Sequence, residues 1–292
     1  MLRLFVLGLL LSALAPAKTI LVVTADASDY ILSAGGTLAG MIASGDKAIV
    51  IRVTNDDKDS WQLDPEETAR RVKQESEAAA KILGVEKVVS LGYRAGELAG
   101  VSPTELRDRI MFYVRVHKPD VMFIPNPYAE YVEVLDRYYT GMAAEEARRV
   151  AALKNHQPPL AVVGVETHVT PELYYYAQPF DPRRREAEST ATFVPQPVTK
   201  DIAATLDKKI RAAQALKTIN YSLANRIKQR LDETNRKLPL LERVDDASVN
   251  KLVETNVRGL GTVCAKDTQY KAAEEMHYAG KDYQVPAALR TK

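Results

Sequence analysis

One stretch near the amino terminus constrains the fold more than any other part of the chain. Residues 19–24 form a β-branched, apolar run that is typical of a buried strand. A short polar loop, residues 26–30, follows this run, and apolar residues then recur at helical spacing up to Met41. Gly35 and Gly36 would let this helix pack closely on the strand. A strand, a loop and a helix in this order open an α/β domain, in which ligand sites lie at the carboxyl ends of the strands.

The alternation of strands and helices continues over the first 200 residues. Further strands are expected at residues 47–54, 88–93, 119–124, 160–165 and, at an edge of the sheet, 169–177, and helices at residues 65–83, 104–117, 201–238 and 245–260. We therefore predict a Rossmann-like α/β fold over residues 18–200, with a mostly parallel sheet and helices on both of its faces. Residues 201–292 are predicted to form a helical C-terminal part packed on the same domain.

Charge and cysteine content narrow the possible partners. The 40 basic and 38 acidic residues give a net charge of +2, which offers no case for nucleic acid as a partner. The chain has 292 residues and a single cysteine, Cys264, so no intrachain disulfide can form.

The first 17 residues are interpreted as a signal peptide rather than as part of the fold. Arg3 precedes an apolar run, residues 4–14, that is too short to span a bilayer. Ala15, Pro16 and Ala17 then form a small-x-small cleavage signal. We expect an exported protein, periplasmic or secreted, with no membrane span after cleavage. The alternative is a buried amino-terminal helix.

The opening stretch resembles the PIG-L/LmbE family of zinc-dependent N-deacetylases. The family pattern is an apolar strand, then Ala-His-Pro-Asp-Asp-Glu, then an apolar pair and Gly-Gly-Thr. The residues that match are Ala25, Asp29, Gly35, Gly36 and Thr37. The residues that depart from the pattern are Asp26 at the metal-binding His, Ala27 at the Pro, Ser28 at the catalytic Asp and Tyr30 at the Glu.

The second metal motif of the family, His-x-Asp-His, has also changed. Registered on Gly141, it corresponds here to residues 134–137, and of its three defined residues only Asp136 matches. The resemblance then implies that Asp26, Asp29 and Arg137 stand at the three metal positions. An arginine does not deprotonate in proteins and cannot ligate zinc, so no zinc cofactor is expected here.

The resemblance implies a matching loss of the catalytic groups. In the family a divalent metal, usually Zn²⁺, polarises an acetyl carbonyl and activates a water molecule, and an Asp takes the proton. Ser28 stands at this base position and Val134 at the oxyanion position, and neither side chain can do that work. Tyr30, Arg94 and Tyr128 are expected to line the same binding cleft as Asp26, Asp29 and Arg137.

The sequence also bears on other metal sites and on a serine hydrolase. None of the four histidines lies in a motif at metal-ligand spacing. Asp26, Asp29 and Asp136 together could suit Mg²⁺ or Ca²⁺. The acidic loop at residues 55–61 lacks the spacing of a Ca²⁺ loop and is interpreted as solvated. Ser28 has no Gly-x-Ser-x-Gly elbow around it, which argues against a serine hydrolase.

The sequence favours an exported, catalytically degenerate member of the deacetylase family. Such a protein would act as a binding or structural module, with a glycan, another small molecule or a protein as its partner. The alternative is an active amide hydrolase with an altered metal site. We further predict that Arg137 replaces the ion as a counter-charge to Asp29, Asp26 or both, because its guanidinium suits carboxylates.

Overall fold

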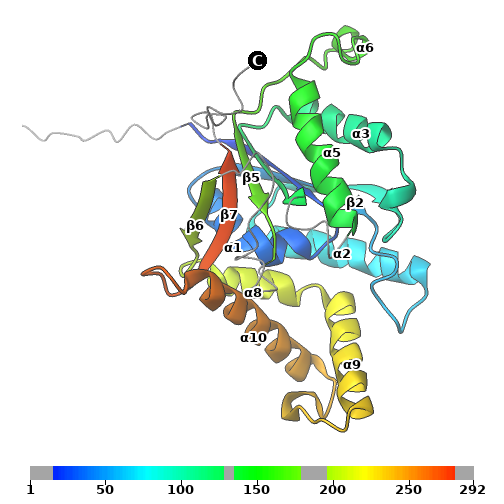
Figure 1. The fold of residues 1–292 in the computed structure, drawn as a ribbon, viewed down its shortest axis with the longest axis vertical. Coiled ribbons are helices and arrows are strands. Elements are labelled where there is room, and N and C mark those ends of the chain that lie inside the picture. Colours follow the sequence, from blue (N-terminus) through cyan, green and yellow to red (C-terminus); the bar gives the residue numbers. More distant parts are fainter. Residues whose placement is uncertain (1–15, 128–134, 179–195, 280–292) are drawn as a thin grey trace, which may run out of the picture.

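One sheet forms the frame of the molecule (Figure 1). The computed structural model describes residues 16–127, 135–178 and 196–279. The strands are β1 (Thr19–Thr24), β2 (Lys47–Thr54), β3 (Lys87–Tyr93), β4 (Val121–Pro125), β5 (Glu172–Tyr176), β6 (Gln196–Asp201) and β7 (Ala273–Ala279). Within the described residues they form a single seven-stranded sheet in the order β3-β2-β1-β4-β5-β7-β6. β1 to β5 pair in parallel, and β7 runs antiparallel to both β5 and β6.

Helices cover both faces of this sheet. They are α1 (Asp29–Ala43), α2 (Pro65–Leu83), α3 (Pro103–His117), α5 (Leu135–Ala151), α6 (Pro159–Val162), α8 (Leu206–Gln214), α9 (Lys217–Glu233) and α10 (Asp246–Ala265), with short 3-10 helices η1 (Leu98–Gly100) and η2 (Pro239–Leu241). The predicted α/β fold with a mostly parallel sheet is confirmed.

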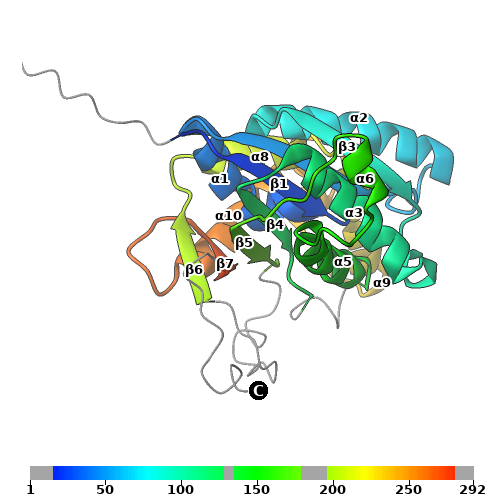
Figure 2. The same ribbon diagram turned by 90° about the horizontal axis from the view of Figure 1, so that it is seen from above.

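Alternation along the strands divides the core into two layers (Figure 2). In β1, Ile20 and Val22 face the layer made by α1, α2, α8 and α10. Leu21 and Val23 face the opposite layer, made by α3 and α5. Both faces of β1 are buried, which explains why its sequence is a continuous apolar run rather than an alternating one.

The apolar run at residues 160–165 is not a strand, and this prediction is wrong. The chain there forms the short helix α6, which projects from the body of the molecule (Figure 1). Val162 and Val163 are 88% and 72% exposed, so this run contributes little to the core. Pro159 opens the helix and Gly164 follows it with a φ of +83°. A short apolar run does not by itself distinguish a strand from a helix.

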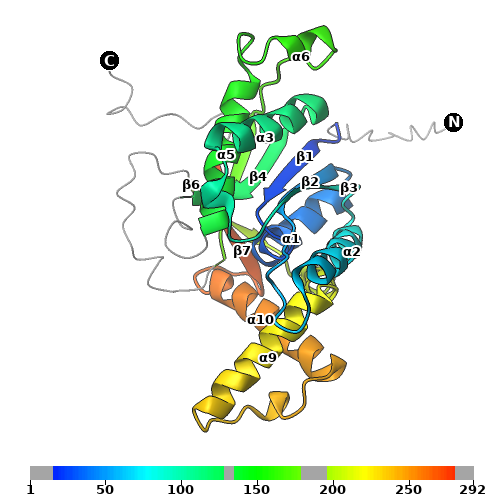
Figure 3. The same ribbon diagram turned by 90° about the vertical axis from the view of Figure 1, so that its right-hand side faces the viewer.

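The C-terminal part is not purely helical, and β5 is not at an edge. Because β7 pairs with β5 and β6 pairs with β7, the last described strand lies inside the sheet. The helical stretch predicted at residues 201–238 is divided into α8 and α9, and α10 confirms the helix predicted at residues 245–260. α9 and α10 extend away from the sheet as a helical pair (Figure 3).

The signal peptide stays a prediction, because residues 1–15 lie outside the described residues. None of the helices formed by the described residues combines the length and apolar character needed to cross a bilayer.

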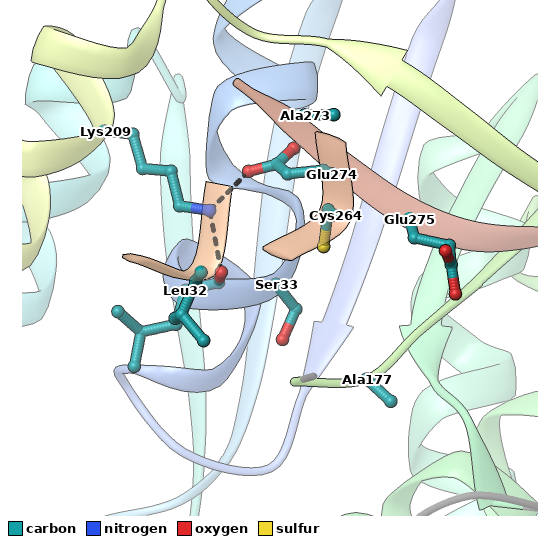
Figure 4. A pocket seen from close by; sticks show the side chains of 9 residues that line it. Leu32, Ser33, Ala177, Lys209, Cys264, Ala273, Glu274 and Glu275 are labelled. Carbon is teal, nitrogen blue, oxygen red and sulfur yellow. Dashed lines mark hydrogen bonds and ion pairs between the residues drawn. The ribbon is translucent and has the colours of Figure 1, made fainter. Parts of the chain in front are cut away.

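The C-terminal part holds α1 through a buried ion pair (Figure 4). Lys209 Nζ lies 2.7 Å from Glu274 Oε1, and the two side chains are 1% and 2% exposed. The Glu274 carboxylate accepts hydrogen bonds from the Gly36 and Thr37 N–H groups, both at 2.8 Å. Lys209 Nζ also donates to the Leu32 carbonyl at 2.7 Å. α8 and β7 therefore fix the middle of the helix whose first turn carries Asp29.

Gly36 allows α1 to pack closely against Ile202. A Cβ atom at this position would lie 2.8 Å from the Cβ and Cγ2 atoms of Ile202, closer than real side chains approach. The glycine that the sequence analysis associated with close packing therefore packs against the residue after β6 rather than against β1.

Replacing Lys209 by Met should destabilise the protein by about 3–5 kcal/mol, because the change leaves the Glu274 charge buried without its partner. Denaturant unfolding measures this loss. The matched control is Lys228→Met at the exposed Lys228–Asp232 pair, whose side chains are 37% and 60% exposed, and it should cost less than about 1 kcal/mol. Equal losses for the two variants would contradict the structural role given to Lys209.

Candidate functional site

The functional site is expected where the direction of strand order reverses. From β1 the chain builds outward to β2 and β3, and then returns to place β4 on the other side of β1. Loops leaving the carboxyl ends of β1 and β4 therefore diverge at this point, where α/β proteins bind their ligands. Asp26 and Asp29 follow β1, and Gln178 follows β5. Arg137, in the first turn of α5, reaches the same place.

Arg137 lies between the two carboxylates, as the sequence analysis predicted. Its Nε atom is 3.0 Å from Asp26 Oδ2 and 3.4 Å from Asp29 Oδ1. The side chains are 9% exposed for Arg137, 18% for Asp26 and 0% for Asp29. The three residues expected at the metal positions thus meet in space, and this contact supports the register used for the second motif.

The approach of α5 to the sheet places Arg137 there. Gly141 lies one turn after Arg137, and a Cβ atom at this glycine would be 2.5 Å from the Pro125 carbonyl oxygen. Any other residue would push α5 away from the end of β4 and withdraw Arg137 from the carboxylates.

Besides the ion pair with Arg137, Asp26 accepts hydrogen bonds from residues at the start of α1. Its Oδ1 atom accepts hydrogen bonds from the Ser28 N–H, the Ser28 hydroxyl and the Asp29 N–H at 2.8–2.9 Å. Burial works to raise the pKa of Asp26, but the charge of Arg137 and the bonds from Ser28 and Asp29 outweigh it, so the pKa is lowered. Asp26 is therefore an anion at neutral pH, and the Ser28 hydroxyl is engaged as a donor to it.

Gln178 completes the group that we call the Arg137 cluster, consisting of Asp26, Asp29, Arg137 and Gln178. The Gln178 side chain is 3% exposed. With the amide turned to satisfy its neighbours, its oxygen accepts hydrogen bonds from Arg137 Nη1 and Nη2 at 3.2 Å. Gln178 was not predicted from the sequence, because no local pattern marks a single amide after a strand.

A second pair of buried charges lies next to the loop that carries Asp26. Arg52, in the middle of β2, is 2% exposed and its Nη1 atom lies 3.1 Å from Asp56 Oδ2. Asp56 is also buried, and its Oδ1 atom accepts a hydrogen bond from the Ala27 N–H at 3.2 Å. Burial raises the pKa of Asp56 above its ordinary value, the charge of Arg52 opposes this, and the charges of Asp26 and Asp59 add to it.

The acidic loop at residues 55–61 is therefore not simply solvated, and that interpretation is wrong. Asp56 is 0% and Asp57 is 5% exposed. Burial and the nearby charge of Asp26 raise the pKa of Asp59 to about 6, against the charges of Arg226 and Arg137. A basic residue inside an apolar strand was the available signal, because a buried Arg52 needs a carboxylate nearby.

The other predicted site residues are placed differently from the Arg137 cluster. Tyr30 is 1% exposed and belongs to the core. Arg94 is 55% exposed and pairs with Asp57 at 3.0 Å. Asp136 accepts from the N–H groups of Gly96 and Leu98 and does not join Asp26 and Asp29. Tyr128 and Val134 lie outside the described residues.

The donor set of the cluster does not fit a zinc ion. Zinc sites need three or four neutral or anionic donors, and here a guanidinium cation stands at the third position, in contact with the other two. Asp136 is engaged elsewhere, so the arrangement of three carboxylates considered for Mg²⁺ or Ca²⁺ does not form. In the described ranges no group of three or more His, Cys, Asp or Glu side chains is placed to hold a metal ion.

Comparison with known proteins gives consistent matches. Residues 21–147 match the model of the family described as PIG-L: GlcNAc-PI de-N-acetylase. The diacetylchitobiose deacetylase of Thermococcus kodakarensis is 25% identical over 161 residues. This match covers 54% of the chain and 60% of the relative's length.

Solved structures share the fold over most of the chain. The N,N'-diacetylchitobiose deacetylase of Pyrococcus horikoshii superposes with a TM-score of 0.70 at 20% identity, covering 91% of this chain and 85% of that one. GalB, the 4-carboxy-2-hydroxymuconate hydratase of Pseudomonas putida KT2440, superposes with a TM-score of 0.62 at 18% identity, covering 92% of this chain and 98% of that one. The same fold therefore serves a deacetylase and a hydratase, and fold alone does not decide the reaction.

Replacing Arg137 by Ala should destabilise the protein by about 3–5 kcal/mol, because it strands the buried charges of Asp26 and Asp29. The free energy of unfolding in denaturant measures this. Arg243→Ala, at a guanidinium that is 87% exposed and pairs with a carboxylate that is 44% exposed, is the control and should cost less than about 1 kcal/mol. If both variants unfold at the same denaturant concentration, the counter-charge role of Arg137 is wrong.

Asp59 should make the stability of the protein depend on pH. Because the folded state raises its pKa from 3.8 to about 6, the folded protein holds a proton that the unfolded chain releases. The free energy of unfolding should therefore fall as pH rises from about 4 to about 6. Asp59→Asn should reduce this fall, to which Asp56 also contributes, and leave the variant more stable than the wild type at pH 7 by about 1–2 kcal/mol, a value reduced for partial exposure.

Unfolding curves at a series of pH values check this prediction. The control is Asp232→Asn, at a carboxylate that is 60% exposed, and it should keep the pH dependence of the wild type. An unchanged slope between pH 4 and pH 6 in the Asp59 variant would contradict the prediction.

Proposed function

On the premise that residues 21–147 form a PIG-L family domain, we propose that this deacetylase-like protein is a zinc-free, catalytically degenerate binding module for amino-sugar glycans. The observation that carries the proposal is the contact of Arg137 with Asp26 and Asp29 at 3.0 and 3.4 Å. A cation built into the chain at this place supplies the charge balance that an ion would otherwise supply, and it removes a ligand position.

The groups of the Arg137 cluster support binding better than hydrolysis of an amide. Hydrolysis needs a nucleophilic water and a group that takes its proton. Asp26, the carboxylate nearest the surface of the cluster, is committed to Arg137 and to the start of α1, and its pKa is lowered. Ser28 donates its hydroxyl to Asp26. Arg137 and Asp26, the least buried groups of the cluster, are suitable partners for sugar hydroxyl and acetamido groups.

The choice of an amino sugar rests on the relatives. The curated relative and one of the superposed structures are named as diacetylchitobiose deacetylases, and this chain is similar to both. We extend to this protein only the class of ligand, a β-linked N-acetylhexosamine oligosaccharide. Residues 1–17 fit a signal peptide, so we place the protein outside the cytoplasm, where such glycans occur.

One observation favours a second candidate, a metal-free amide hydrolase. Burial and the charge of Asp26 raise the pKa of Asp59 to about 6, and a carboxyl group with this pKa can act as a general base near neutral pH. In this alternative Arg137 would stabilise the developing oxyanion.

The two candidates differ in what the purified protein does with a chitooligosaccharide. We expect elemental analysis to find no stoichiometric zinc, calorimetry to detect saturable binding of chitotetraose, and an acetate assay to detect no release. Arg137→Ala should weaken binding by about tenfold or more, because the guanidinium makes charge-assisted hydrogen bonds. Asp232→Asn, on the exposed face of α9, should bind as the wild type does.

The outcomes separate the proposals. About one zinc ion per chain would overturn the binding-module proposal. Release of acetate by zinc-free protein would favour the hydrolase, and its loss in Asp59→Asn would assign the base. Absence of binding to any chitooligosaccharide would reject the proposed ligand class.

A further inference from the structure

A single tryptophan stands at the rim of the site. Trp61, the only Trp in the chain, is 63% exposed although it lies in an ordered turn after β2. Its backbone N–H donates to the Ser222 hydroxyl at 3.3 Å, and Ser222 is 0% exposed. The loop is therefore attached to α9, and the indole is presented to solvent from a fixed base.

An arginine of α9 lies over this ring. The Arg226 Cζ atom is 5.5 Å from the centroid of the Trp61 ring, within the range of a cation–π contact. Arg226 follows Ser222 by four residues, so both project from the same face of α9. Among the described residues Arg226 Nε is buried without a hydrogen-bond partner. The two terminal nitrogens of the guanidinium carry the further N–H donors with which it can bind a ligand.

The loop that carries Trp61 contacts the loop that carries Asp26. Asp56, five residues before Trp61, accepts a hydrogen bond at Oδ1 from the Ala27 N–H at 3.2 Å, and Ala27 directly follows Asp26. The charges of Asp26, Arg226 and Arg137 also act on the pKa of Asp59, two residues before Trp61. Trp61 and Arg226 therefore lie on the side of the cluster that is bounded by the loop after β2, and not on a remote face.

The chemistry around the indole fits a sugar ring better than an apolar protein surface. Asp59, Ser60 and Gln62 flank Trp61 in the chain and are polar. A pyranose ring presents a face of C–H groups of about this size, with hydroxyl groups around its edge. Such a face stacks on the electron-rich face of an aromatic ring, while the hydroxyls accept from a nearby donor such as Arg226.

We propose that Trp61 and Arg226 form a sugar-stacking subsite that holds a second ring of a β-linked N-acetylhexosamine oligosaccharide whose first ring lies at the Arg137 cluster. This inference rests on the proposed function and adds to it the residues that would select an oligosaccharide over a monosaccharide. Trp61 lies within the part of the chain matched by the PIG-L model, and Arg226 comes from α9, which follows that part, so the subsite joins the two parts of the chain.

The single tryptophan gives a direct readout. Tryptophan emission of the purified full chain reports on Trp61 alone, and we expect chitotetraose to change it in a saturable way. The same titration by calorimetry gives the affinity independently of the indole. Trp61→Ala should weaken binding by about tenfold, Trp61→Phe should weaken it less because a ring remains, and Arg226→Gln should weaken it by about three- to tenfold.

The matched control is Phe112→Ala, at an aromatic residue of α3 that is 38% exposed, and it should leave the affinity unchanged. Circular dichroism and unfolding curves show whether the variants are folded. If Trp61→Ala does not fold, Trp61→Phe still tests the subsite.

The results separate this inference from the function on which it rests. One result would overturn the subsite and leave glycan binding standing. Calorimetry would then detect binding without a change in emission, and Trp61→Ala and Trp61→Phe would both bind with the affinity of the wild type. Absence of binding to the wild type by both methods would overturn the subsite and the proposed ligand class together.

Discussion

The placement of Arg137 between Asp26 and Asp29 is the interaction on which the site depends. Two carboxylates three residues apart at the start of α1 converge on one point and would repel each other without a cation. The Arg137 guanidinium supplies this positive charge. Its position is fixed because Gly141 brings α5 against the end of β4. A buried arginine in this position makes the charge balance a permanent property of the chain rather than one that depends on a bound ion.

The C-terminal third of the chain completes both the sheet and the site. Glu274 of β7 and Lys209 of α8 bond to the middle of α1, whose first turn carries Asp29. Arg226 of α9 lies against the loop that follows β2. The part of the chain with the least recognisable pattern therefore fixes the helix and loop that surround the Arg137 cluster, and the proposed binding of a glycan would draw on both.

The sequence predicted the frame of the fold well and its edges poorly. β1 to β4, α1, α2, α3 and α10 follow from apolar periodicity and from breaks such as Gly84, which ends α2 with a φ of +95°. Residues 160–165 and β7 did not follow. The first is apolar yet exposed, and the second carries Glu274 at a buried position, so in both places the local pattern opposes the environment that the fold provides.

The sequence by itself determined which chemical groups are present at the motif positions, because residue type is a local fact. Asp26, Ser28 and Arg137 were identified there without coordinates, and the pairing of Arg137 with the carboxylates followed from charge. Only the tertiary structure decided that Asp136 turns to the Gly96 and Leu98 N–H groups, that Asp56 is buried with Arg52, and that Gln178 and Arg226 approach the site. These contacts join segments up to 165 residues apart, and periodicity along one segment carries no information about the partner that another segment brings to it.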